Sequence, residues 1–165
     1  MFVKKNLYYQ HVLNNLGKFN NRKIIMSKFI EWDNRYSVGI KIIDDQHKHL
    51  LELTNALHDA CRSHGHSHEK TRQKFRESIQ SAVSYVQVHF STEEKLMDKT
   101  DYPGTNAHKL EHKKFIQKVL ENIKAFEEGK TFVPNAFVRF LKDWILEHIA
   151  IQDRQMGLHF LQLKK

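Results

Sequence analysis

The sequence contains few residues that interrupt helices. Only two prolines and six glycines occur among its 165 residues, and residues with good helix propensity dominate between them. This composition favours an all-α protein. A chain of this length fits one domain with a sizeable buried core.

The sequence also has a single cysteine and no long apolar run. With only Cys61, an internal disulfide framework is excluded, and the composition suits the reducing cytoplasm. Cys61 lies in an apolar helical run, which favours a packing role over a reactive thiol. No apolar run approaches the roughly 20 residues that a membrane-spanning helix needs, so no transmembrane segment is expected.

The net charge of +8 is unevenly distributed. Residues 1–25 carry five basic residues and no acid, whereas residues 26–165 carry 22 basic and 19 acidic residues. The main body therefore has a mixed surface without a concentrated basic stripe. Nucleic acid is not an expected partner.

Residues 1–25 are predicted to be an N-terminal extension to a domain formed by residues 26–165. The extension lacks the unbroken apolar core of a secretory signal. It is either a short basic amphipathic helix that touches a membrane surface or partner, a disordered segment, or sequence ahead of a true start at Met26. Residues 29–39, with three aromatic side chains, are predicted to form an arm that packs across the domain.

Apolar residues recur at intervals of three and four along four segments, which predicts four amphipathic helices. The expected ranges are about 44–62, 70–98, 105–128 and 134–157. Their boundaries are predicted from Asp44 and Thr105 as N-caps, Pro134 in a first turn, and Gly129 and Gly157 as ends. Short connections favour an up-down-up-down antiparallel four-helix bundle.

Twelve histidines are an unusual number for such a chain, and the positions of some of them indicate a shared role. Five histidines and one carboxylate fall inside the apolar stripes that face the bundle core: His47, His89, Glu93, His108, His112 and His148. One histidine in such a stripe is commonly a hydrogen-bonded core residue. Because unpartnered buried polar groups are costly, six from four helices together predict a bound metal.

The ligand types limit the metal. Imidazole and carboxylate ligands without thiolate suit iron, zinc, manganese or copper, and this many exceed what one tetrahedral zinc uses. A two-metal site fits the count, but it needs a second carboxylate. Asp153 lies about 140° around an ideal helix from His148, and Glu147 also points away, so spacing does not choose between them.

A second histidine-rich segment, residues 63–68, alternates histidine with glycine and serine. Such segments more often form solvated loops with weak, adventitious metal affinity. We do not expect a specific site there.

Several spaced motifs resemble the hemerythrin family, particularly the single-domain bacterial hemerythrins, over about residues 28–160. The motifs are Trp32, Val38-Gly39, Ile43-Asp44-Asp45-Gln46-His47, His89-Phe90-x-x-Glu93-Glu94-x-x-Met97, Tyr102-Pro103, His108-x-x-x-His112 and Trp144-x-x-x-His148-Ile149-x-x-x-Asp153. They follow the family's order, and no ligand position departs from its pattern.

The resemblance implies a non-haem di-iron centre with an oxo or hydroxo bridge. On the family pattern, one iron is bound by His108, His112 and His148, the other by His47 and His89, and both by Glu93 and Asp153. The implied oxygen pocket is lined by Leu50, Phe90, Trp144 and Ile149, which helical spacing alone reads as core residues.

The implied function is reversible binding of dioxygen, for transport, storage or delivery to a partner not identified by sequence, rather than enzymatic catalysis. We expect a cytoplasmic monomer or weak oligomer. One alternative is an oxygen or redox sensor that acts through a separate partner chain. Another is a di-iron oxidase or peroxidase, although the chain has no Glu-x-x-His motif of the ferritin-like oxidases. The third alternative is a structural four-helix domain in which the histidines are incidental.

Overall fold

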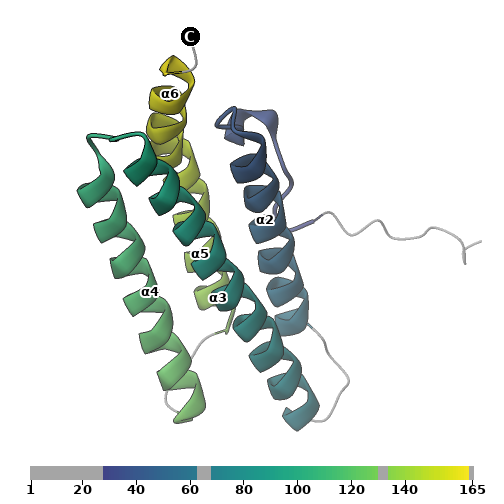
Figure 1. Ribbon diagram of the computed structural model, residues 1–165. Helices are drawn as coiled ribbons and strands as arrows, with labels where there is room; N and C mark the ends of the chain where they lie inside the picture. Colours follow the sequence, from purple (N-terminus) through teal and green to yellow (C-terminus); the bar gives the residue numbers. More distant parts are fainter. Residues whose placement is uncertain (1–27, 63–67, 130–133, 164–165) are drawn as a thin grey trace, which may run out of the picture.

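The protein is an antiparallel four-helix bundle, as the sequence predicts. The computed structural model describes residues 28–62, 68–129 and 134–163. In chain order its elements are η2 (Asn34–Tyr36), α2 (Lys41–Arg62), α3 (His68–Lys99), α4 (Thr105–Glu127), α5 (Pro134–His148), η3 (Ile149–Asp153) and α6 (Arg154–Gln162). Successive long helices run in opposite directions, and α5, η3 and α6 together form the fourth (Figure 1).

Two predicted N-caps are wrong. Helix α2 begins at Lys41, so Asp44 lies within its first turn, where its carboxylate accepts hydrogen bonds from Ser37 Oγ at 2.6 Å and Val38 N at 2.8 Å. Thr105 is already helical, and its hydroxyl donates to the Tyr102 carbonyl oxygen at 2.6 Å. Both side chains hold the preceding segment in place instead of capping.

The predicted ends of two helices have different outcomes. Gly129 follows the last turn of α4 with a φ of +65°, a left-handed conformation that glycine adopts readily. Gly157, in contrast, is buried within α6, which continues to Gln162. A Cβ atom at Gly157 would lie 2.6 Å from the Val38 carbonyl oxygen, so this glycine permits close packing of the arm and does not end the helix.

The N-terminal arm packs across the bundle as predicted. The Asn55 side chain accepts a hydrogen bond from Ile30 N at 2.9 Å and donates one to Ile30 O at 2.8 Å. Ile30 is buried in an apolar cluster with Leu51, Ile145 and Ile149. The arm thus covers the junction of α2 with α5 and η3.

Within the described residues, no helix is both long and apolar enough to span a bilayer. The predicted N-terminal extension, residues 1–25, lies outside the described residues. So does nearly all of the histidine-rich segment 63–68.

Candidate metal centre

Seven side chains that the sequence singled out meet inside the bundle. They come from every long helix and from η3: His47, His89, Glu93, His108, His112, His148 and Asp153. Each residue is at most 4% exposed. Glu147, the other carboxylate considered for this centre, is exposed.

A π-helical turn brings Asp153 to the centre. The Arg154 backbone N–H donates to the Ile149 carbonyl, five residues earlier, at the end of η3. Such a turn holds an extra residue, so a residue five positions after His148 returns to its face. Asp153 Oδ1 consequently lies 3.1 Å from His148 Nε2. A regular helical period could not predict this placement.

Three imidazoles converge at one end of the centre. His148 Nε2 lies 3.0 Å from His108 Nε2 and 3.1 Å from His112 Nε2. Glu93 Oε2 is 3.3 Å from His112 Nε2 and 3.7 Å from His108 Nε2. These four residues offer ligand atoms within 4.8 Å of one another and could hold one metal ion.

A second group of ligand atoms shares Glu93 with the first. It consists of His47, His89, Glu93 and Asp153, again with all ligand atoms within 4.8 Å. Asp153 Oδ2 lies 3.1 Å from His47 Nε2, while its other oxygen lies 3.2 Å from His108 Nε2. Glu93 and Asp153 therefore lie between the two histidine groups, where a carboxylate could bridge two ions.

The buried polar atoms of the centre fit a metal better than a hydrogen-bonded core. In the described part of the chain, neither oxygen of Glu93 or of Asp153 has a hydrogen-bond partner. The same holds for both nitrogens of His47. Leaving one such buried group unsatisfied costs about 1–3 kcal/mol. Metal ions coordinated by these oxygens and by His47 Nε2 would remove most of this cost, because the atoms already face common points.

The pKa values of two imidazoles favour the neutral form that metal binding requires. Burial, together with repulsion from His47 as a like charge, lowers the pKa of His89 to about 3. Burial also lowers the pKa of His112 to about 2, with repulsion from His148 and His108 adding to the effect. Both rings are therefore neutral at pH 7 and have a free lone pair.

The two carboxylates have opposite pKa shifts. Burial and repulsion from Asp153 raise the pKa of Glu93 well above its usual range. Burial also opposes the charge of Asp153, but His148 and His108 outweigh it and hold the pKa of Asp153 well below its usual range. Burial would likewise lower the pKa of His108, yet the two carboxylates raise it to about 9. At pH 7 these shifts favour protons on Glu93 and His108 beside an ionised Asp153.

An apolar cavity adjoins the ligands. All four residues of the predicted oxygen pocket line it, namely Leu50, Phe90, Trp144 and Ile149, together with His89, His148 and Asp153. The Phe90 ring stacks on His112 with centroids 3.6 Å apart, and Trp144 stacks on His148 at 4.3 Å. These aromatic faces fix the imidazole orientations and keep the surroundings apolar.

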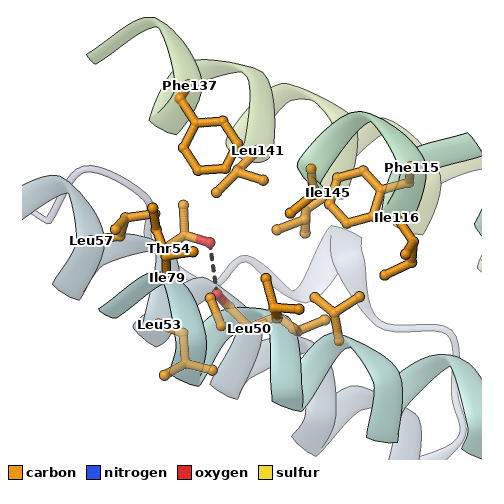
Figure 2. A pocket seen from close by; sticks show the side chains of 14 residues that line it. Leu50, Leu53, Thr54, Leu57, Ile79, Phe115, Ile116, Phe137, Leu141 and Ile145 are labelled. Carbon is orange, nitrogen blue, oxygen red and sulfur yellow. Dashed lines mark hydrogen bonds between the residues drawn. The ribbon is translucent and has the colours of Figure 1, made fainter. Parts of the chain in front are cut away.

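Figure 2 shows a second apolar cavity further along the core, lined by side chains from α2, α3, α4 and α5. Leu50, Val86, Phe115 and Ile145 line both cavities. Thr54 is the one polar residue that lines the second cavity, and its hydroxyl donates a hydrogen bond to the Leu50 carbonyl oxygen at 2.8 Å. The surroundings of the ligands on this side are therefore apolar.

Two residues that contact the ligands were not predicted as site residues. Gln46 Oε1 lies 3.2 Å from His89 Nδ1, and Glu94 Oε1 lies 3.0 Å from His112 Nδ1. Each is adjacent in sequence to a ligand residue, His47 or Glu93. Helical spacing does not single out Glu94, because a residue five positions after His89 lies about 140° around an ideal helix.

Fold and site together define a metal-binding four-helix bundle whose ligands are imidazoles and carboxylates. The family model described as the hemerythrin HHE cation binding domain matches residues 38–157, so the chain belongs to the hemerythrin family. A bacteriohemerythrin of Methylococcus capsulatus is 30% identical over 74% of this chain and 88% of its own length. One of Pseudomonas paraeruginosa is 34% identical over 74% of this chain and 75% of its own. A crystal structure of wild-type hemerythrin, 28% identical, superposes with a TM-score of 0.72 over 80% of this chain and 98% of that chain.

Proposed function

We propose that this protein binds dioxygen reversibly at a centre of two non-haem iron ions. His108, His112 and His148 would hold one ion and His47 and His89 the other, with Glu93 and Asp153 bridging them. The observation that carries the proposal is the pair of buried ligand groups that share Glu93. The names of the relatives, hemerythrin and bacteriohemerythrin, support the same assignment.

The donor set favours iron among the candidate metals. Nitrogen and carboxylate donors without sulfur suit iron, and their number exceeds the four ligands of a structural zinc ion. When bound, two ferrous ions supply the electrons that a dioxygen ligand takes up and returns on release. The group with two histidines provides one protein ligand fewer than the other, so we assign the dioxygen ligand to that side.

The residues around the ligands support binding without further reaction. Leu50, Phe90, Trp144 and Ile149 would surround a small neutral ligand with apolar atoms and exclude water. Few anionic donors are available to stabilise iron in high oxidation states. A carrier, store or delivery protein is therefore favoured over an oxidase or peroxidase, and over a sensor that acts through a separate partner.

The deciding experiment measures metal content and the visible spectrum of the purified chain without and with oxygen. We expect about two irons per chain, following the two ligand groups, and a visible absorption band that appears in air and disappears on deoxygenation. Zinc, a single ion or an unchanging spectrum would contradict the proposal. Irreversible oxidation with turnover of a substrate would identify an oxidase instead.

Three coarser expectations accompany this proposal. Residues 26–165 form the functional domain, and residues 1–25 are an extension to it. The protein acts in the cytoplasm as a monomer or weak oligomer. Limited proteolysis, cell fractionation and sedimentation of the full chain test these in turn.

A further inference from the structure

The hydrogen bonds around His89 fix which of its nitrogens carries the proton. The Thr92 hydroxyl donates to the Val88 carbonyl oxygen at 2.8 Å, so Thr92 Oγ1 can only accept from Gln46 Nε2, which lies 3.0 Å away. This contact directs the Gln46 carbonyl oxygen toward His89 Nδ1, at 3.2 Å. An amide oxygen only accepts hydrogen bonds, so Nδ1 carries the hydrogen and the Nε2 lone pair faces the centre.

His112 is oriented in the same way, but by a charged partner. Its Nδ1 lies 3.0 Å from Glu94 Oε1, and an ionised carboxylate only accepts. The hydrogen is therefore on Nδ1, and Nε2 offers its lone pair toward His148 and Glu93. Glu94 is 34% exposed, so water also solvates its charge.

The two groups of ligands thus differ in the charge of the residue that accepts a hydrogen bond from one histidine. The partner is an ionised carboxylate for His112 and a neutral amide for His89. We propose that Glu94 and Gln46 are positioning residues that make the two metal ions inequivalent, Glu94 through a negative charge on His112 and Gln46 through a neutral amide on His89. This inference rests on the proposed function, since it concerns the same centre. It assigns stronger electron donation toward a bound metal ion to the ligand group with three histidines.

The physical basis is the effect of an outer hydrogen bond on the ligand ring. A carboxylate that accepts the Nδ1 hydrogen makes the ring more basic and a stronger donor, and hydrogen bonds to ionised acceptors are about twice as strong as neutral ones. Stronger donation favours the more highly charged metal ion. An ion held by His112 would therefore give up an electron more easily than an ion held by His89, whose outer partner is neutral.

The first test changes only the charge of the partner. Glu94→Gln retains an acceptor of nearly the same shape but removes the negative charge, so the reduction potential of the iron-loaded protein should rise. Gln46→Glu adds the charge on the other side, and the potential should fall. Glu121→Gln and Gln80→Glu make the same charge changes at exposed positions and should shift it much less. Equal shifts in site and control variants would overturn the inference.

The second test does not depend on iron or oxygen. In the zinc-loaded chain, ¹⁵N NMR should show Nδ1 protonated and Nε2 bound to metal in both His89 and His112. Glu94→Ala should weaken zinc binding about 10- to 100-fold, measured by chelator competition, whereas Glu121→Ala should not. Zinc bound through Nδ1 of either ring, or equal affinities, would refute the positioning roles.

The two tests separate this inference from the proposed function. If the parent chain showed no oxygen-dependent band, the function would fail, yet the zinc measurements would still decide the positioning roles. If the band appeared normally but Glu94→Gln and Glu121→Gln behaved alike in both tests, only the inference would fail.

Discussion

The proposed role of Asp153 as a metal ligand depends on the imidazoles that surround its carboxylate. Its carboxylate is fully buried, has no hydrogen-bond partner within the described residues and lies within 3.2 Å of three imidazoles. Glu147 belongs to the same helical rod but is exposed. The two carboxylates therefore allow a matched comparison of charge inside and outside the centre.

Asp153→Asn should reduce iron affinity by at least about 100-fold, because a neutral amide is a far poorer metal ligand than a carboxylate and cannot bridge two ions. The measurement is iron retained per chain after dialysis against a weak chelator. Glu147→Gln, which removes the same charge, should retain iron like the parent. Loss of iron in both variants would point to helix damage and contradict the assignment.

Cys61 should react slowly, because burial raises the pKa of its thiol to about 11. The thiolate is the reactive form, and free cysteine has a pKa of about 8.5. Alkylation of the folded chain at pH 8 should be roughly two orders of magnitude slower than that of free cysteine, and should accelerate up to about pH 11. In urea the rate should match free cysteine. Rapid reaction of the folded chain would show that the thiol is accessible.

At the scale of elements, the π-helical turn η3 and the arm serve the same region of the bundle. Residues Ile149–Asp153 form the turn that directs Asp153 inward. Ile149 packs in turn against Ile30 of the arm. The arm therefore stabilises the segment on which the position of Asp153, a proposed bridging carboxylate, depends.

Asn55→Ala should loosen the arm, because it removes both hydrogen bonds to the Ile30 backbone. We expect a loss of about 1–3 kcal/mol in the free energy of unfolding, measured by urea denaturation, and faster hydrogen exchange at the Ile30 amide. Asn122, whose side chain donates an exposed hydrogen bond to the Lys118 carbonyl oxygen, provides the control. Asn122→Ala should leave Ile30 protected, and equal exchange in both variants would contradict the role of Asn55.

For the whole molecule, the metal centre and the fold are expected to depend on each other. The candidate ligands come from all four long helices, so two bound metal ions would together join the helices at their centre. Without metal, the bundle must bury two carboxylates whose oxygens lack hydrogen-bond partners in the described chain. Metal binding should therefore contribute to folding stability.

Removing iron with a chelator should lower the melting temperature by roughly 10 °C. A metal ion present at a thousand times its Kd contributes about 4 kcal/mol, and 1 kcal/mol shifts the melting temperature of a chain of this size by about 2–4 °C. Calorimetry before and after chelation, then after iron is restored, measures the effect. An unchanged melting temperature would favour a structural bundle with incidental histidines.

Much of the architecture could be predicted from the sequence because it depends on local periodicity. Apolar spacing of three and four residues gave the helices, and the same spacing placed His108 and His112 on one face. Capping was less predictable. Asp44 and Thr105 are good cap residues by type, but their side chains bond to a preceding segment whose path is fixed by tertiary packing.

The sequence by itself thus determined the four helices, the inward-facing histidines and, through resemblance, the family's ligand pattern. Helical spacing did not choose between Asp153 and Glu147. The resemblance implied Asp153, and only the tertiary structure showed why it faces these histidines, because its inward direction depends on a π-helical turn that no regular period contains. The structure also decided the roles of Gln46 and Glu94, whose partners lie 43 and 18 residues away along the chain. Contacts between helices depend on how the helices pack, which local sequence does not specify.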